Sequence, residues 1–368
     1  MKILFLTNCP SPYRIRFFNE LSKYCELTVV FEMEQARNRD KLWRTDEKFQ
    51  FDAIFLKSIF QKQEGAFCPQ IVKYLKKFKK DIIIVGGYST PTGMWSILYM
   101  RNHHIPFILN CDGGMIKQDN FVKYKVKKFF IGSASYWLST GKICSKYLAH
   151  YGAEKQKIFQ YPFTSIRECE IGHITDTQKK VLKDRLGIKE KIIVLFVGSF
   201  IYRKGLDVLI EACKELENVA LVLVGGDNIP EIWSAKDVDV KCNIYIEGFK
   251  NEQEIKQYYQ VADMFVLPTR EDIWGLVVNE AMAAGIPVIT TSKCGAGLEL
   301  IHDDQNGYIV QENAVDLLQK KIKYLSADNE LREYMGQNNL AKIRNYTIEK
   351  MAERHMDIFT RITNECNK

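Results

Sequence analysis

Short apolar runs rich in β-branched residues alternate with stretches of helical period through the first half of the chain. The runs of strand length are Lys2–Thr7, Glu26–Phe31, Asp52–Leu56, Asp81–Val85, Pro106–Asn110 and Tyr136–Ser139. The helical stretches between them are Arg14–Tyr24, Pro69–Lys79, Thr92–Asn102 and Phe121–Phe130. Apolar strands that alternate with helices are typical of a parallel sheet covered on both faces. This half is therefore predicted to be α/β.

A second series of the same kind follows in the other half. Its strand-length runs are Lys191–Val197, Ala220–Val224, Ile244–Glu247, Met264–Leu267 and Pro287–Thr290. Its helical stretches are Leu206–Leu216, Glu252–Val261 and Leu276–Ala284. Beyond them the pattern is helical throughout, over Asp316–Leu325, Glu330–Arg344 and Thr347–Thr363. The chain is predicted to hold two α/β sheets in sequence and a helical tail.

The domain boundary is placed in Thr164–Lys180, where the periodicity is weak and the composition is mixed and polar. We predict a first domain over residues 1–165, a linker over 166–182 and a second domain over 183–346. The last segment, 347–368, is predicted to be a helix that packs back on the first domain.

Composition excludes several classes of protein. The chain has 368 residues, of which 46% are hydrophobic and 26% charged, with 31 Gly and Pro together. These values exclude disordered and collagen-like chains and suit a globular enzyme of two or three domains. No apolar run reaches the ~20 residues of a membrane span, and no signal peptide is expected. The ten cysteines form no C-x-x-C pair, so reduced thiols and a cytoplasmic location are predicted.

The stretch from Val266 to Ile289 carries the most informative chemistry. An apolar strand ends at Pro268, an acidic loop follows, and a helix is expected from Leu276. Asp272 in the loop and Glu280 in the helix are separated by seven residues. Ligands bind at such strand ends in open α/β sheets, and two carboxylates there suit sugar or ribose hydroxyls. As an isolated pair, Asp272 would more simply be a helix-capping residue and Glu280 a solvated helix carboxylate.

A basic turn occurs at the corresponding place after an earlier strand of the same half. Gly198 ends that strand, and Arg203 and Lys204 come directly before a helix that opens at Gly205. Two cations beside a helix N-terminus can hold a diphosphate. Taken alone, an Arg-Lys-Gly turn would be an ordinary solvated loop.

Together these motifs resemble those of the family 4 glycosyltransferases. The matching stretches, in order, are Gly198–Gly205, Leu221–Gly226, Glu247–Phe249, the acid-x7-Glu pair with Ala281–Val288 after it, and Asn306–Val310. The resemblance implies the GT-B fold, with two Rossmann-like domains whose parallel sheets face each other across a cleft. It also implies a retaining enzyme that uses a nucleotide-diphosphate sugar, with UDP the expected nucleotide.

The resemblance assigns roles in the second domain. Diphosphate binding falls to Lys204, Arg203 and Ser199; ribose and sugar binding to Glu280, Asp272, Trp274 and Gly275; base binding to Gly248, Phe249 and Lys250. Asp272 is also a predicted catalytic residue. Two departures from the family pattern put these roles in question: Asp272 stands where Glu is usual, and Ser199 where Arg is usual.

The first domain is expected to bind the acceptor. Tyr13 and Arg14 follow the first strand, and Gly87 and Tyr88 follow another strand end. Asp112 is the candidate catalytic residue of this domain, because the preceding cysteine replaces a histidine that many relatives carry. Strand-end residues of these types are also ordinary turn residues.

The resulting hypothesis is a glycosyltransferase of bacterial surface polysaccharide synthesis, with a glycan or lipid-diphosphate-linked acceptor. No cofactor and no metal are expected, since Asp237–Asp239 lies in a connection rather than at a strand end and the histidines lack zinc spacing. Two alternatives remain: a nucleotide-sugar epimerase or hydrolase on the same fold, or a non-catalytic nucleotide-sugar-binding subunit. No Gly-x-Gly-x-x-Gly follows the first strand of either half, which disfavours an NAD dehydrogenase.

Charge is divided unevenly along the chain. Residues 1–165 hold 26 Lys and Arg against 13 Asp and Glu, whereas the rest has an acidic excess. Nine of the lysines gather on two expected helices beside aromatic residues: Lys73, Lys76, Lys77, Lys79, Lys80, Lys123, Lys125, Lys127 and Lys128. This pattern predicts peripheral binding to an anionic membrane at its cytoplasmic face. The alternative is that the lysines only solubilise the domain. Nucleic-acid binding is not expected, because no recognition motif accompanies the charge.

Overall fold

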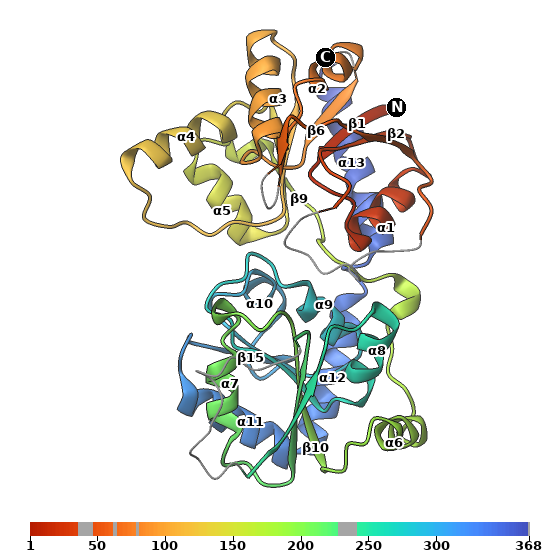
Figure 1. The fold of residues 1–368 in the computed structure, drawn as a ribbon, viewed down its shortest axis with the longest axis vertical. Helices are drawn as coiled ribbons and strands as arrows, with labels where there is room; N and C mark the ends of the chain where they lie inside the picture. Colours follow the sequence, from red (N-terminus) through yellow and green to blue (C-terminus); the bar gives the residue numbers. More distant parts are fainter. Residues whose placement is uncertain (36–46, 62–64, 79–80, 227–240, 367–368) are drawn as a thin grey trace. The chain divides into compact units, whose positions relative to one another are not determined.

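The computed structural model describes the whole chain except residues 36–46, 62–64, 79–80, 227–240 and 367–368. Asp237–Asp239, Lys79 and Lys80 lie outside the described residues. The chain divides into two compact units (Figure 1). Unit 1 comprises Met1–Ser165 and Thr347–Lys368, and unit 2 comprises Ile166–Tyr346.

Unit 1 is built on a seven-stranded parallel sheet of order β3-β2-β1-β6-β7-β8-β9. The strands are β1 Lys2–Thr7, β2 Glu26–Phe31, β3 Asp52–Phe55, β6 Ile82–Val85, β7 Ile108–Cys111, β8 Tyr136–Ser139 and β9 Ile158–Gln160; β4 Phe60–Gln61 and β5 Ala66–Phe67 form a separate hairpin. The helices are α1 Pro12–Leu21, α2 Ile71–Lys77, α3 Pro91–Asn102, α4 Phe121–Ile131, α5 Lys142–His150 and α13 Ile348–Cys366. The C-terminal helix α13 packs along α1, on the opposite side of the sheet from α3 and α5 (Figure 1).

Unit 2 contains a six-stranded parallel sheet of order β12-β11-β10-β13-β14-β15. Its strands are β10 Ile192–Val197, β11 Val219–Val224, β12 Asn243–Glu247, β13 Met264–Leu267, β14 Val288–Thr291 and β15 Gly307–Val310. Its helices are α6 Asp176–Arg185, α7 Leu206–Cys213, α8 Glu252–Val261, α9 Leu276–Ala283, α10 Gly295–Leu300, α11 Val315–Ala327 and α12 Asn329–Ile343. The predicted fold class, two α/β units with parallel sheets, is confirmed.

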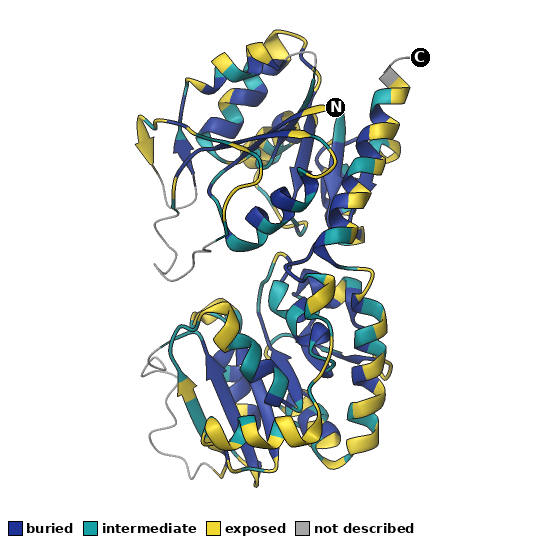
Figure 2. Cartoon of the chain, turned by 90° about the vertical axis from the view of Figure 1, so that its right-hand side faces the viewer, coloured by how far each residue is buried: buried dark blue, intermediate teal, exposed yellow. Residues whose placement is uncertain are grey.

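Burial explains why the apolar runs became strands. All six residues of β10 and of β11 are buried, and in Figure 2 the central strands are dark blue while exposed residues gather on helices and loops. A parallel strand covered on both faces needs apolar side chains at every position. The continuous runs in the sequence are thus the interior of each sheet.

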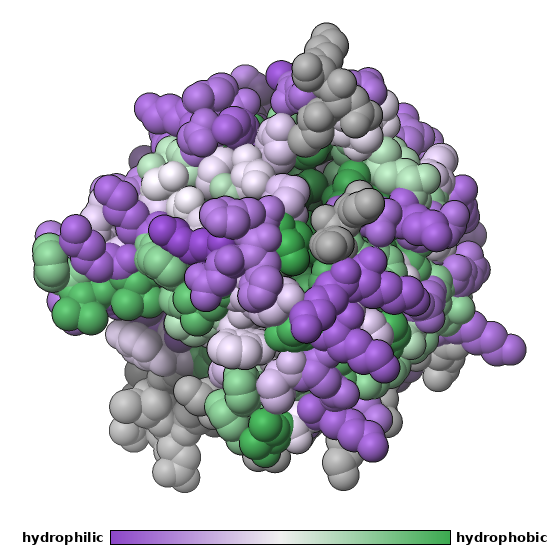
Figure 3. All heavy atoms as spheres, turned by 90° about the horizontal axis from the view of Figure 1, so that it is seen from above, coloured by the Kyte–Doolittle hydropathy of each residue, from purple (hydrophilic) through white to green (hydrophobic). Residues whose placement is uncertain are grey.

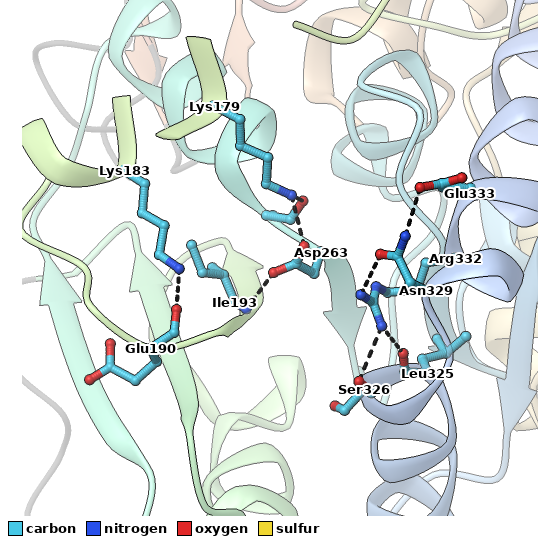
Figure 4. A network of polar contacts seen from close by, with 11 residues as sticks. Lys179, Lys183, Glu190, Ile193, Asp263, Leu325, Ser326, Asn329, Arg332 and Glu333 are labelled. Carbon is cyan, nitrogen blue, oxygen red and sulfur yellow. Dashed lines mark hydrogen bonds and ion pairs between the residues drawn. The ribbon is translucent and has the colours of Figure 1, made fainter. Parts of the chain in front are cut away.

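A helix occupies part of the predicted linker 166–182. Helix α6 begins at Asp176, where Thr175 and Gln178 form a reciprocal capping box. Lys179 joins α6 to the sheet, because its Nζ lies 2.7 Å from an Asp263 carboxylate oxygen, and the other oxygen of Asp263 accepts the Ile193 N–H at 2.8 Å (Figure 4). The polar surface of α6 hid its periodicity, whereas the Thr-x-x-Gln spacing was a signal for its start.

Within the described residues, no helix has both the length and the apolar composition needed to cross a membrane.

Candidate active site

The topology of unit 2 places the candidate donor residues at one edge of its sheet. Strands β11 and β12 extend the sheet on one side of β10, and β13 then joins it on the other side. The strand order therefore reverses between β10 and β13, and ligands of open α/β sheets bind outside the carboxyl ends at such a point. Lys204 follows β10 and Asp272 follows β13, so both lie at this reversal.

Lys204 and Asp272 form an ion pair. The Lys204 Nζ lies 2.5 Å from the Asp272 Oδ2, and the two side chains are 12% and 13% exposed. Their residues are 68 positions apart in the sequence. The lysine proposed for a diphosphate and the acid proposed for a sugar are thus in direct contact.

The turn that carries Lys204 depends on Gly205. Tyr202–Lys204 form a 3₁₀ turn, and Gly205 then takes φ +72° and precedes α7. A Cβ at Gly205 would lie 2.0 Å from the Pro268 carbonyl oxygen. Only glycine allows both the left-handed backbone and this close approach, which brings the basic turn against the end of β13.

The acidic loop is held by backbone contacts to the segment after β14. The Asp272 N–H donates to the Lys293 carbonyl at 2.9 Å, and the Gly295 N–H donates to the Asp272 carbonyl at 3.0 Å. Trp274 is buried, and its indole N–H donates to Asn279 Oδ1 at 3.0 Å. The ring of Trp274 is thus buried beside Asn279, and its predicted contact with the sugar stays a prediction. Gly275, with φ +95°, is the N-cap residue directly before α9.

Glu280 projects from α9 toward α8. Its Oε2 accepts the Tyr259 hydroxyl at 3.0 Å. Burial, with the charge of Glu280, raises the pKa of Tyr259 well above its usual range, so this tyrosine is a hydrogen-bond donor. Glu280 is half-buried and keeps a fixed orientation, which a solvated helix carboxylate would lack.

The remaining donor-side candidates lie on the same edge of the sheet. Gly248, Phe249 and Lys250 follow β12 and are half-buried, and the Lys250 Nζ lies 2.9 Å from Glu247. Ser199 is exposed just after β10. The guanidinium of Arg203 is exposed and donates to the Glu271 carbonyl at 2.9 Å, beside the acidic loop.

The sheet of unit 1 has its own reversal of strand order, between β1 and β6. Tyr13 and Arg14 follow β1, and Gly87 and Tyr88 follow β6, so the structure brings the acceptor-side candidates to this point. Arg14 is buried, whereas Tyr13 and Tyr88 are half-buried. The Tyr88 hydroxyl is hydrogen-bonded to the hydroxyl of Tyr147 in α5.

Asp112 is held by three side chains. It pairs with Arg14, accepts the Asn110 amide at 2.8 Å and accepts the Tyr161 hydroxyl at 3.2 Å. Burial alone would lower the pKa of Arg14, but the Asp112 charge outweighs it, and the pKa lies above its usual range. The predicted catalytic acid of unit 1 is therefore a charge partner of a buried arginine, with a side chain that is 27% exposed.

The C-terminal helix α13 contacts Tyr161, which donates a hydrogen bond to Asp112. His355 of α13 is buried, its ring centroid lies 4.5 Å from that of Tyr161, and its Nδ1 lies 2.7 Å from the Met351 carbonyl oxygen. Burial lowers the pKa of His355 to about 4. The histidine is thus neutral near pH 7 and adds no second positive charge beside Arg14.

Glu32, at the end of β2, is a buried acid near the Gly87–Tyr88 loop. Its Oε1 accepts the Thr90 hydroxyl at 2.6 Å and its Oε2 accepts the Ala66 N–H at 3.0 Å. Thr90 also caps α3. Burial raises the pKa of Glu32 to about 7, because hydrogen bonds from neutral donors only partly replace the lost hydration of the carboxylate.

This raised pKa predicts a pH-dependent stability. The pKa of an unfolded Glu is ~4.3, so the folded state binds the proton more tightly, and the stabilisation present below that pH is lost as pH rises through about 7. The free energy of unfolding of Glu32→Gln, measured relative to wild type, should therefore rise by ~2–3 kcal/mol from pH 5 to pH 8. Urea titrations at both pH values measure this change. Glu26→Gln, at an exposed position, is the control. For Glu32→Gln, a stability difference from wild type that is the same at pH 5 and pH 8 would contradict the expectation.

Metal ligands do not gather in the described residues, which contain no group of three or more His, Cys, Asp or Glu placed to hold an ion. Asp237–Asp239 lies outside them. The positive charges at the unit 2 edge include Lys204 and the exposed Arg203, which lie beside the N-termini of α7 and α9, and helix N-termini carry partial positive charge.

Comparison with known proteins identifies the class of enzyme. The family model for glycosyl transferases group 1 matches residues 178–342, which include Lys204, Asp272 and Glu280. The chain is a glycosyltransferase. It is 24% identical over 295 residues to an uncharacterized glycosyltransferase of Methanocaldococcus jannaschii, covering 76% of this chain and 80% of the relative.

Two further comparisons show how much of the chain is similar to known proteins in sequence or in structure. The glycosyltransferase is 25% identical to the lipopolysaccharide glucosyltransferase WaaG of Escherichia coli over 236 residues, 62% of each chain. Its structure matches that of Anabaena HepE in complex with UDP, with a TM-score of 0.77, 15% identity, and coverage of 98% of this chain and all of the other. The GT-B fold and the transferase class predicted from the sequence are thereby confirmed.

Several residues that shape the site were missed by the sequence analysis. Tyr161 and His355 gave no signal, because a buried aromatic residue after a strand or on an amphipathic helix looks like any core residue. Arg270 lies two positions before Asp272, and its place in the motif was the signal that could have found it.

Proposed function

We propose that this glycosyltransferase is a retaining enzyme of family 4 that transfers a sugar from a UDP-sugar. The Lys204–Asp272 pair at the strand reversal of unit 2 carries the proposal. A diphosphate needs a cation beside helix N-termini, and a sugar needs acceptors for its hydroxyls. Lys204 beside α7 and Asp272 before α9 supply one of each. UDP as the nucleotide is supported by the complex of Anabaena HepE, which has the same fold.

The proposed division of roles is the one that the resemblance to family 4 implies, and the positions of the three side chains support it. Lys204 would bind the diphosphate and neutralise its charge as it leaves, and Glu280, fixed by Tyr259, would bind the ribose hydroxyls. Asp272 and the loop backbone up to Gly275 would bind the transferred sugar. Retention without a protein nucleophile implies attack from the side of the leaving group, whose phosphate oxygen takes the acceptor proton. Catalysis then rests on positioning and on charge stabilisation.

The acceptor would bind unit 1 at the ends of β1, β6 and β7. Arg14, Asp112 and Tyr88 place one charged pair and one hydroxyl there, which suits a polar glycan or a lipid-diphosphate-linked glycan. The likeness to WaaG, named a lipopolysaccharide glucosyltransferase, supports a role in bacterial surface polysaccharide synthesis.

Turnover of a panel of UDP-sugars, with and without acceptor glycans, tests the proposal. We expect release of UDP that depends on the acceptor, a product with the anomeric configuration of the donor, and activity that persists in EDTA, since side chains and helix dipoles replace a metal. UDP release that needs no acceptor would indicate a hydrolase, and an altered donor sugar an epimerase. Activity abolished by EDTA and restored by Mg²⁺ would contradict metal independence.

Membrane binding is proposed for α4 and not for α2. On α4 the apolar Phe121 and Val122 are 74% and 70% exposed, and Lys123, Lys125 and Lys128 are exposed beside them. Figure 3 shows hydrophobic surface between strongly hydrophilic side chains at the left edge, where α4 lies. Tyr74 on α2 and Phe78 directly after it pack in or against the core, so the lysines of α2 lack an exposed aromatic partner.

This contrast predicts which lysines matter. Reversing Lys123, Lys125 and Lys128 to Glu should abolish sedimentation with anionic vesicles at low salt, because each lysine near such a surface contributes ~1 kcal/mol. The matched control is the triple Lys→Glu variant at Lys73, Lys76 and Lys77. It changes the net charge by the same amount and should reduce vesicle binding less. Equal losses from both triple variants would mean that net charge alone, not α4, drives binding. A wild-type enzyme that stays in the supernatant would exclude membrane attachment by this surface.

A further inference from the structure

Arg270 is a half-buried arginine between β13 and the acidic loop, and the proposed roles leave it unused. Its guanidinium makes two contacts with the Asp207 carboxylate, Nη1 to Oδ1 at 2.9 Å and Nη2 to Oδ2 at 2.7 Å. Nη1 also donates to the Tyr202 carbonyl at 2.7 Å, and Nε donates to Asn313 Oδ1 at 2.7 Å. The guanidinium carbon lies 3.9 Å from the centroid of the Tyr202 ring.

These contacts converge on the turn that carries Lys204. Tyr202 is the first residue of that turn, and Asp207 lies in the first turn of α7 directly after it. The Arg270 N–H donates to the Arg203 carbonyl at 2.7 Å, and Thr269 Oγ1 donates to the same carbonyl at 2.8 Å. The turn is therefore fixed on both sides of Lys204 by the residues that precede Asp272.

The same arginine connects the turn to a third segment. Asn313 lies between β15 and α11 and has φ +63°. Arg270 thus joins the segments after β10, β13 and β15 at one edge of the sheet. A planar guanidinium with fixed donor directions can hold three partners at once, whereas a lysine ammonium cannot reproduce the bidentate contact.

We infer that Arg270 is a positioning residue that holds Lys204 in place for the donor diphosphate. This inference rests on the proposed donor site. Arg270 acts through Lys204 and not on the ligand, because its guanidinium already binds a carboxylate, a carbonyl and an amide oxygen. This role of Arg270 accounts for a site that relies on Lys204 and has Ser199 where the resemblance leads one to expect arginine. An ammonium on a turn that is already held in place loses less entropy when it binds a ligand.

A double-mutant cycle measured by calorimetric titration with UDP tests the inference. We expect Arg270→Met to weaken UDP binding about tenfold and Arg270→Lys by less. Adding Arg270→Met to Lys204→Ala should cause no further loss, because the residue acts through the lysine that has been removed. Arg332→Met is the matched control: Arg332 donates to the Leu325 carbonyl and to Asn329 Oδ1 on α12 (Figure 4), away from the turn, and its loss should leave UDP binding unchanged.

Each outcome has a distinct meaning. Wild-type UDP affinity in Arg270→Met would overturn the inference. Losses that multiply in the double variant would overturn it too and would put Arg270 on the ligand itself. If Arg270→Met does not fold, the cycle is run with Arg270→Lys, and the same two results decide. A wild-type protein that does not bind UDP would instead refute the proposed function.

Discussion

Replacing Lys204 by alanine should weaken UDP binding by about 10- to 150-fold, since a hydrogen bond to a charged group contributes ~1.5–3 kcal/mol. The ammonium lies beside the first residues of α7 and is 12% exposed, so water screens its contact with a phosphate poorly. Isothermal titration with UDP measures the change. Lys214→Ala at the other end of α7 is the control, because Lys214 pairs with Glu211 on the same helix.

The acid that faces Lys204 should give the opposite result. Asp272 pairs with the ammonium of Lys204, so a diphosphate that binds Lys204 must compete with this carboxylate. Asp272→Asn should tighten UDP binding, because the diphosphate then displaces a neutral amide in place of a carboxylate, while it lowers turnover of the intact donor. The pair of variants separates the roles: a loss of UDP affinity from Asp272→Asn equal to that from Lys204→Ala would contradict the role proposed for Asp272.

Removing the positive charge of Arg14 should destabilise unit 1 by ~3–5 kcal/mol, because a buried ion pair that loses one partner leaves an uncompensated charge. The Arg14 side chain is 8% exposed. Arg14→Met would leave Asp112 with donors from Asn110 and Tyr161 alone. Hydrogen exchange followed by mass spectrometry resolves the two units and should show faster exchange in β1 and β7 but not in β10 and β13.

Two comparisons make this expectation specific to the buried pair. Lys23→Met breaks the exposed Lys23–Glu20 pair at the end of the same helix and should cost at most ~1 kcal/mol. Adding Asp112→Leu to Arg14→Met should recover part of the lost stability, because no unpaired charge then remains. A double variant with the summed losses of both single variants would show that the two residues stabilise unit 1 independently.

The sequence by itself determined the α/β architecture. Strands such as β1, β2 and β13 have the bounds of apolar runs in the sequence, or lie within a residue of them, because a strand buried on both faces must be apolar throughout. Glycines and prolines marked the turns in the sequence. The acid-x7-Glu spacing predicted that Asp272 precedes a helix start and that Glu280 follows it. Helix α6 was missed because its surface is polar and its start was signalled only by Thr175 and Gln178.

The partners of the strand-end residues were decided by the tertiary structure alone. Lys204 meets Asp272 across 68 residues, and Arg14 meets Asp112 across 98. Both contacts depend on which strands become neighbours in a sheet, and that order follows from long-range packing that no local pattern records. The same packing buried the ring of Trp274, left α4 with an exposed apolar face, and placed Arg270 where it holds three segments together.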